Sequence, residues 1–345
     1  MDLKLLKKIC ETPGAPGFES KIRELVIKEI KPYVHELRTD NMGNLIALIK
    51  GREPVSIMAS AHLDEIGFIV THIDDQGFIF FHTLGGFDPK TLTAQRVIIH
   101  GKKDIIGVMG SKPIHIMSAE EKTKAPKIND FFIDTGLSIE EVKRNIEIGC
   151  PITRERSLIV MGDNINCKSL DNRISVYILI EAIKKLKNPP YDFYAVFSVQ
   201  EEVGIRGAQV AAHQINPDFG LGIDTTIAYD VPGAKDEEMI TKLGGGVAIK
   251  VMDASTICDT RMVSFLKESA TKNKIPFQLE ILTAGGTDTA NIQRMGKHGS
   301  IAGAISIPTR HIHQVIEMVN KKDVLSAIDL LCTAVNKMDK YKWDH

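Results

Sequence analysis

The fold of this chain can be inferred first from one segment, Val55-Ser56-Ile57-Met58-Ala59-Ser60-Ala61-His62-Leu63-Asp64. Its first seven residues are apolar or small, and such an uncharged run predicts a strand that is buried on both faces of a sheet. The run stops at His62, and Asp64 follows closely. Because α/β sheets form their sites beyond the carboxyl ends of central strands, this segment indicates both a fold and a place for chemistry.

Helical and strand patterns alternate on both sides of this segment. Two amphipathic helices are predicted at about 2–10 and 19–31, and a strand is predicted at 44–50. After about residue 161 the alternation returns, which is typical of βαβ winding. The later helices are predicted at 172–187, 262–272 and 321–337, and the later strands at 191–199, 219–223, 246–252, 277–282 and 300–307. A shorter helix is predicted to run towards Met295, with Asp288 as its cap.

Residues 69–160 have a different character, with short β-rich segments and turn signals such as Asp74–Gly77. One helix is expected there, because Ser138 and Glu141 form a capping-box pattern. The polar stretch 118–127 is expected to be an exposed loop. We therefore predict an α/β fold with a mixed sheet flanked by helices, formed by residues 1–68 and 161–345, and a small β-rich domain inserted at 69–160.

The composition is that of an ordinary globular protein. Of the 345 residues, 43% are hydrophobic and 25% are charged, and 43 basic residues nearly balance 44 acidic ones. A chain without a strong net charge has no general attraction to nucleic acid or to an anionic membrane. No stretch approaches the roughly 20 apolar residues of a membrane helix. The expected partner is therefore small or neutral.

The cysteines predict a reducing environment. They are odd in number, widely spaced and free of a Cys-x-x-Cys pair, which argues against a disulfide framework and against a thiolate zinc site. The first residues lack the apolar core of a secretory signal, so we expect a cytoplasmic protein. The cysteines are Cys10, Cys150, Cys167, Cys258 and Cys332.

Potential metal ligands lie where predicted strands end. A set of His, Asp and Glu without cysteine is typical of a hydrolytic zinc, cobalt or manganese centre rather than of a structural zinc site. Such a centre favours attack by a metal-activated water on a polarised carbonyl, with a carboxylate that handles the proton. The candidates are His62, Asp64, Glu201, Glu202, Asp224 and His313 at strand ends, with Asp171 beside the start of a helix.

Taken singly, each candidate has an ordinary structural explanation. A lone histidine at a strand end is more often a hydrogen-bonded structural residue, and Glu201-Glu202 could be a solvated pair. Asp171 could be an acidic residue in the first turn of a helix, and Asp224 could form an Asx turn. Cys167 lies close to Asp171 in sequence, and we interpret it as structural.

Five motifs in order resemble the signature of the tetrahedral (TET) aminopeptidases, a family that includes glutamyl and deblocking aminopeptidases and some members labelled endoglucanases. The resemblance spans essentially the whole chain. The motifs are His62–Gly67, Leu170–Arg173, Glu201–Gly207, Gly222–Asp224 and Arg310–His313, with similar stretches at Ile9–Gly14 and Gly285–Asp288.

The resemblance implies a zinc-peptidase-like catalytic domain that holds two divalent metal ions, zinc or cobalt, and hydrolyses N-terminal residues from peptides. It also implies a role for each matched residue. Asp171 bridges both metals, His62 and Asp224 hold one, Glu202 and His313 hold the other, Glu201 is the general base, and Asp64 orients the imidazole of His62.

The resemblance further implies that the inserted domain is a dimerisation module and that dimers form a hollow tetrahedral dodecamer. An ordinary dimer is the alternative. One departure from the family pattern is Gln314-Val315, where the family usually has Ser or Thr followed by Pro. This difference concerns the loop that carries His313, while His313 and Glu317 remain.

Two other functions stay open on the sequence. The first is a related metallohydrolase, such as an N-acyl amino acid deacylase or a dipeptidase, or less favourably a glycan hydrolase; glycosidases generally use two carboxylates without a metal pair. The second is a non-enzymatic assembly or binding module, which predicts missing ligands. The sequence names neither the preferred N-terminal residue of the substrate nor the metal used in the cell.

Overall fold

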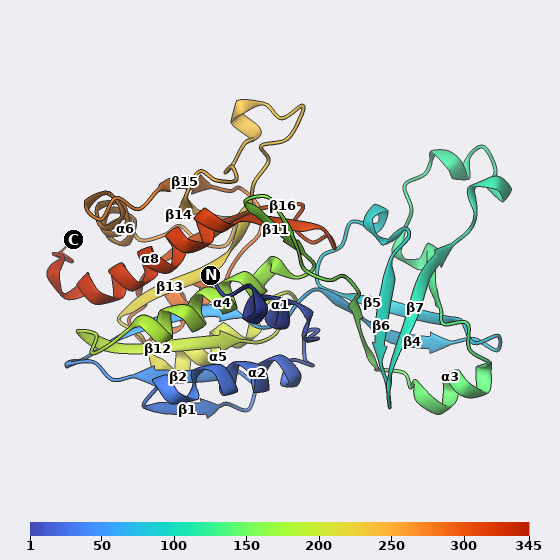
Figure 1. The fold of residues 1–345 in the computed structure, drawn as a ribbon, viewed down its shortest axis with the longest axis horizontal. Coiled ribbons are helices and arrows are strands. Elements are labelled where there is room, and N and C mark those ends of the chain that lie inside the picture. The colour runs from blue at the N-terminus through green and yellow to red at the C-terminus, as the bar shows by residue number, and fades with distance from the viewer. Residues whose placement is uncertain (345) are drawn as a thin grey trace.

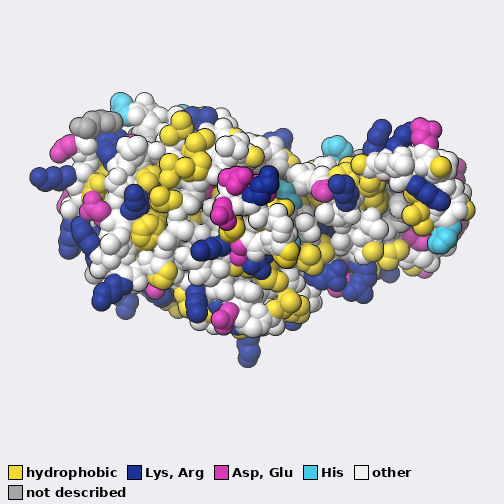
Figure 2. Space-filling view, turned by 90° about the horizontal axis from the view of Figure 1, so that it is seen from above, with side chains coloured by type: hydrophobic (Ala, Val, Ile, Leu, Met, Phe, Trp, Pro, Cys, Tyr) yellow, Lys and Arg dark blue, Asp and Glu magenta, His cyan; other side chains and the backbone are white. Residues whose placement is uncertain are grey.

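The computed structural model describes residues 1–344, which form a large α/β part and a smaller barrel joined by a narrow waist (Figures 1 and 2). The large part contains an 11-stranded mixed sheet with helices on both faces, and the smaller part is a closed barrel of six strands. The predicted fold class, a mixed α/β sheet with an additional β-rich part, is confirmed. Acidic and basic side chains are interspersed on both lobes in Figure 2.

Four parallel strands form the centre of the large sheet, in the order β12-β3-β13-β16. Strand β3 (Glu53–His62) contains the segment quoted first, and its side chains are fully buried from Ile57 onward. Its neighbours are β12 (Tyr191–Ser198), β13 (Phe219–Ile227) and β16 (Ile301–Arg310). Because these strands are parallel, their carboxyl ends meet at one edge of the sheet.

The remaining strands extend the sheet on both sides. Strand β2 lies antiparallel to β12, while β14 and β17 both pair with β16. The bounds are β1 (Glu36–Thr39), β2 (Leu45–Ile49), β10 (Ile159–Met161), β11 (Asn164–Cys167), β14 (Val247–Met252), β15 (Phe277–Ile281) and β17 (Glu317–Asn320).

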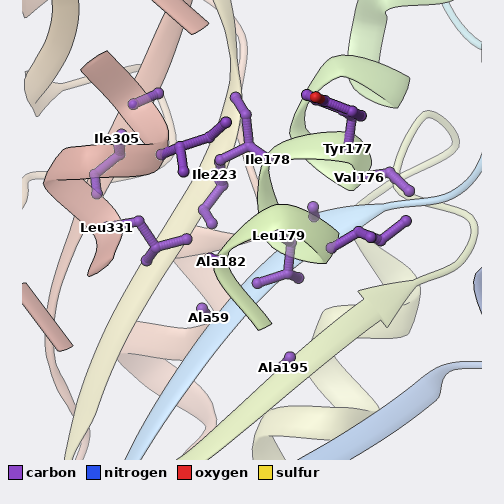
Figure 3. Close-up of a cluster of buried hydrophobic side chains, with 14 of the residues drawn as sticks. Ala59, Val176, Tyr177, Ile178, Leu179, Ala182, Ala195, Ile223, Ile305 and Leu331 are labelled. Carbon is purple, nitrogen blue, oxygen red and sulfur yellow. The ribbon is translucent and has the colours of Figure 1, made fainter. Parts of the chain in front are cut away.

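Helix α4 (Leu170–Lys185) is the centre of the main core. It is buried on nearly all sides, because it lies between the sheet and α8 (Lys321–Lys337). Figure 3 shows how side chains from α4 meet small or branched residues of the strands below, such as Ala59, Ala195 and Ile223. Helices α1 (Leu3–Glu11), α2 (Ser20–Ile30) and α6 (Thr260–Lys272) contribute to the same core.

The opposite face of the sheet is covered by α5 (Arg206–Ile215) and α7 (Thr289–Met295). Ala211, Ala212 and Ile292 of these helices pack against Met58 and Val196 of the strands. The small alanines allow α5 to approach the sheet closely. The helix predicted to run from Asp288 towards Met295 is present as α7. Helix α5 was not predicted, because it is short and an alanine-rich helix that faces a sheet has a weak apolar periodicity.

The barrel strands follow the order β4-β5-β8-β7-β6-β9. Alternate residues point into a separate apolar core that includes Phe68, Ile99 and Ile133. Helix α3 (Ile139–Asn145) begins at Ser138 with the predicted capping box. The strands are β4 (Gly67–Ile73), β5 (Ile79–Leu84), β6 (Arg96–His100), β7 (Asp104–Ser111), β8 (Phe131–Asp134) and β9 (Pro151–Arg154). The division of the chain after residues 68 and 160 stays a prediction.

The predicted helices and strands of the large part are present within a few residues of their expected bounds. The sequence did not predict four strands of only three or four residues each, which are β1, β10, β11 and β17. Short strands of this kind are defined by their partners rather than by a periodic pattern. All five cysteines are free thiols. Among residues 1–344, no helix combines the length and the apolar character that a bilayer crossing requires.

Candidate active site

The chain brings the predicted site residues together at the carboxyl edge of the four parallel strands. His62 is the last residue of β3, Asp224 lies in β13, and Glu201 and Glu202 follow β12 directly. His313 lies in the turn after β16. Positions separated by some 250 residues in sequence therefore face a common space, because neighbouring strands end at the same level.

Asp171 lies between the two imidazoles. Its Oδ1 atom is 3.4 Å from Nε2 of His62, and its Oδ2 atom is 3.5 Å from Nε2 of His313. It precedes the regular part of α4, since Asp171 and Asn172 depart from helical backbone angles. One carboxylate that presents an oxygen to each imidazole has the geometry of a bridging ligand.

The other three carboxylates surround the imidazoles. Oδ1 of Asp224 is 3.7 Å and Oε2 of Glu201 is 3.8 Å from Nε2 of His62. Oε2 of Glu202 is 3.5 Å from Nε2 of His313. Ligand atoms of His62, Asp171 and Glu202 all lie within 4.8 Å of one another, which is close enough for a shared cation.

Asp64 supports the site in a way that differs from the sequence expectation. The backbone carbonyl of Asp64, not its carboxylate, lies 3.0 Å from Nδ1 of His62, while the carboxylate Oδ1 is 3.6 Å away. The carboxylate instead accepts the backbone N–H groups of Glu201 and Glu202, at 3.1 and 3.0 Å. Asp64 thus fixes the loop that carries both glutamates, and its backbone orients His62.

Glu317 ties two further site residues together. Its side chain is fully buried, one carboxylate oxygen accepts the N–H of Asp171 at 2.9 Å, and the other accepts the N–H of His313 at 3.0 Å. The sequence did not predict this role for Glu317. An acidic residue between an apolar strand and a helix is common on protein surfaces, so the pattern alone does not indicate a buried contact.

The electrostatics of the site show an excess of negative charge. Burial raises the pKa of Glu202 to about 7, and burial also raises the pKa of Glu201 and of Asp224 well above the ordinary range. Burial disfavours the charged imidazolium, but contact with Asp171 and the charge of Asp224 together raise the pKa of His62. Carboxylates that are crowded in this way need positive charge beside them in order to stay ionised.

The donor set fits divalent cations. Oε1 of Glu202 is buried without a hydrogen-bond partner in residues 1–344, so it is free to act as a ligand. When ionised, Asp171, Glu201, Glu202 and Asp224 carry four negative charges, which equal the charge of two divalent ions. Imidazole and carboxylate ligands without thiolates suit zinc, cobalt or manganese in a catalytic site.

A cavity of about 460 Å³ opens over these groups. Both imidazoles and the four carboxylates line it. Apart from Lys250, the other lining residues are uncharged. The apolar side chains among them are Ile205, Ile227, Leu282, Ala284 and Ile312.

The sequence model of the M42 glutamyl aminopeptidases matches residues 43–330. This chain belongs to the M42 glutamyl aminopeptidase family. It is therefore an aminopeptidase, a class of hydrolase.

Similar proteins agree with this assignment. A lysyl aminopeptidase from Pyrococcus furiosus is 34% identical over 337 residues, which cover 96% of this chain and 95% of the relative. The structure of an aminopeptidase from Desulfurococcus kamchatkensis is 36% identical, with a TM-score of 0.93 over 97% of this chain and 94% of that one. The Pyrococcus horikoshii TET1 peptidase, described as able to assemble into a tetrahedron or a large octahedral shell, is 32% identical with a TM-score of 0.87, covering 96% of this chain and 98% of that one. The resemblance to TET aminopeptidases is confirmed.

The backbone of this M42 aminopeptidase is strained around the site. Gln200, Ile205, His311 and His313 all have positive φ angles between 55° and 63°, although none is glycine. Such conformations cost about 1–3 kcal/mol each and persist where the surrounding contacts fix them. Gln200 immediately precedes Glu201, and His313 is itself a predicted ligand, so the strained positions belong to segments that carry site residues.

Asp288 corrects one sequence expectation. We expected its side chain to cap helix α7, but Asp288 has helical backbone angles and makes no side-chain capping bond. Its Oδ2 atom instead accepts the hydroxyls of Ser60 in β3 and Ser198 in β12, at 2.6 and 2.5 Å. The sequence places one serine inside each of two apolar strands. A buried hydroxyl needs a hydrogen-bond acceptor, and Asp288 is the acceptor for both.

Proposed function

We propose that this protein removes N-terminal residues from peptides with a water that is activated by two divalent cations. The observation that carries the proposal is the position of Asp171, with one oxygen toward His62 and the other toward His313. Under this proposal Asp171 bridges the cations. His62 and Asp224 complete the protein ligands of one cation, and Glu202 and His313 complete those of the other.

When bound, two divalent cations would polarise the scissile carbonyl and lower the pKa of a water between them. The remaining steps belong to side chains of the chain. The side chain of Glu201 is 10% exposed and lines the same cavity as the ligands, so its carboxylate can take the proton of the attacking water and return it to the leaving amine. Asp64 holds the backbone of Glu201 and thereby fixes the direction of that carboxylate.

The family favours an aminopeptidase over the alternatives left open by the sequence. A deacylase built on the same ligands would require an acylated amine, whereas an aminopeptidase requires a free α-amine. The presence of all five predicted ligands and of Glu201 around one cavity argues against a non-catalytic module. A glycan hydrolase has no support in the family match, and the crowded carboxylates here surround two imidazoles rather than flank a sugar-sized gap.

Removal of metal and choice of substrate test this proposal together. We expect the purified protein to cleave aminoacyl anilides and short peptides, to lose this activity in a chelator, and to regain it with zinc, cobalt or manganese. N-acetylated amino acids should be poor substrates, because they lack the free amine. Faster release of acetate from N-acetyl amino acids than of anilines from aminoacyl anilides would instead identify a deacylase.

We also propose that the chain forms a homo-oligomer in which the barrel mediates dimers and dimers form a dodecamer. The support is the similarity to TET1 and a set of exposed apolar side chains on or beside barrel strand β7. Ile106, Val108, Ile114 and Ile116 are 60%, 48%, 60% and 68% exposed, which is unusual for large aliphatic residues outside an interface. The five free cysteines are compatible with the cytoplasmic location expected from the sequence.

Light scattering coupled to size-exclusion chromatography measures the assembly directly. We expect a mass of about twelve times the 38.1 kDa subunit. Changing Ile106 and Val108 to lysine should reduce this mass, because charged side chains would lose solvation in an apolar interface. A wild-type protein that remains a monomer over the measured concentrations would refute the proposed assembly.

A further inference from the structure

The two halves of the proposed metal centre are supported by different parts of the molecule. Beside His62, the supporting group is the backbone carbonyl of Asp64, which follows β3 of the large sheet. Beside His313, Nδ1 of the ring lies 2.9 Å from the carbonyl oxygen of Gly86, in the loop after barrel strand β5. This carbonyl can accept a hydrogen bond from Nδ1–H, which leaves Nε2 of His313 free to bind a cation.

The loop that carries Gly86 is closely fitted to the site. The preceding Gly85 has a φ of +103°, and a Cβ atom there would lie 2.5 Å from Ile66 and 3.4 Å from the side chain of Glu202. Only glycine satisfies both constraints. The barrel therefore approaches the His313 side of the site through a segment that has no room for a side chain.

A second barrel residue, Arg154, is linked to His313 indirectly, because it contacts Glu317, which binds the backbone of His313. Arg154, the last residue of barrel strand β9, is 2% exposed, and its Nη2 atom is 4.0 Å from Oε1 of Glu317. The guanidinium also lies 5.8 Å from the ring centre of Phe87. Its three nitrogens have no hydrogen-bond partner among residues 1–344, so the charge of Glu317 is its principal polar contact there.

Glu317 transmits this contact to two ligands, because its two oxygens hold the backbone N–H groups of His313 and Asp171. The guanidinium of Arg154 attracts the carboxylate of Glu317 and so helps to hold it in the position from which it accepts both N–H groups. The position of Arg154 thus determines how firmly the His313 turn is held.

We propose that the barrel is a structural part of the metal centre, and that Arg154 acts through Glu317 as a positioning residue for His313. This inference rests on the proposed function. The cation at His313 and Glu202 then depends on the packing of the barrel against the sheet. The cation at His62 and Asp224 depends on it less, because the two cations share only the bridge Asp171, and the carbonyl that supports His62 follows β3 of the large sheet.

Cation binding by the metal-free full-length protein tests the inference. Arg154→Met retains the aliphatic bulk and removes the charge, and Arg154→Lys keeps a charge. Arg96→Met is the matched control, because Arg96 lies on the adjacent barrel strand β6 and pairs with Glu155 on the surface at 2.9 Å. Calorimetric titration with Co²⁺ gives the affinity of each binding step, and the visible Co²⁺ spectrum reports the ligand geometry.

We expect Arg154→Met to weaken one of two Co²⁺ steps by about 10-fold or more, as removal of such supporting contacts typically does. The other step should weaken by a smaller factor, because Glu317 supports it only through the shared ligand Asp171. The Co²⁺ spectrum should change, and Arg154→Lys should recover part of the affinity. Glu317→Gln should weaken the same step, and adding Arg154→Met to it should have little further effect. Arg96→Met should bind both ions as the wild type does.

Two results would overturn the inference. One is unchanged Co²⁺ affinity and an unchanged spectrum in Arg154→Met. The other is equal weakening of both steps with a lower melting temperature, which would show only a general structural role. Failure of the proposed function would give a different result, namely a wild type that binds Co²⁺ but cleaves no aminoacyl substrate. The titrations would still decide in that case whether Arg154 positions His313.

Discussion

Replacing Glu201 by glutamine should reduce kcat by about 10²–10⁴-fold while the protein keeps its cations. Glutamine has the same size, so the loop fixed by Asp64 should not move. Its amide cannot accept the proton of the attacking water, and this lost proton transfer is the reason for the slower turnover. Steady-state kinetics with an aminoacyl anilide and metal analysis by mass spectrometry after dialysis measure the two effects.

Glu202→Gln is the matched comparison for this prediction. The two glutamates are adjacent, but Glu202 faces His313 at 3.5 Å and belongs to the close ligand cluster. Its replacement should lower the metal content as well as the rate. A Glu201→Gln protein with wild-type kcat would remove Glu201 as the base, and equal loss of metal in both variants would make Glu201 a ligand instead.

Replacing Asp171 by alanine should remove most of the bound metal and all measurable activity. Among residues 1–344, Asp171 alone presents an oxygen to both imidazoles, so its loss should weaken both cation sites at once. Contact with His313 and His62 outweighs burial and lowers the pKa of Asp171, which keeps this carboxylate ionised in the folded protein. Metal content per subunit after dialysis is the decisive measurement.

The control for this variant lies on the same helix. Glu181 is on the outer side of α4 and contacts Lys184 at 3.2 Å, far along the helix from the site. Glu181→Ala should retain full metal content and activity. Two tightly held ions in Asp171→Ala would contradict the bridge, and the centre would then consist of two independent sites.

The fold was largely predictable because its signals are local. The uncharged run before His62 predicts a buried strand, since a central parallel strand has no solvent-facing side. The same reasoning applies to the strand that precedes Glu201. Where the local signal is weak the prediction failed, as for α5, whose alanines match the sheet in shape rather than in hydrophobic pattern.

The residues of the candidate site were also largely predicted from the sequence. Each polar residue at a strand end has an ordinary structural explanation when taken singly, and the resemblance of the ordered motifs to a family implied a role for each of them. The sequence did not show which way each side chain points or which partner it contacts. Asp288 precedes a helix and was expected to cap it, but the hydroxyls of Ser60 and Ser198 compete for its carboxylate from strands that are distant in sequence.

Local sequence was sufficient to place the longer strands and helices and the side chains at the ends of the central strands, because these depend on the chemistry of neighbouring residues. Only the tertiary structure decided that Asp171 lies between His62 and His313, and that Arg154 of the barrel faces Glu317. Those contacts depend on the order and register of strands far apart in the chain. Register arises from the packing of the whole sheet and barrel, so no short stretch of sequence contains it.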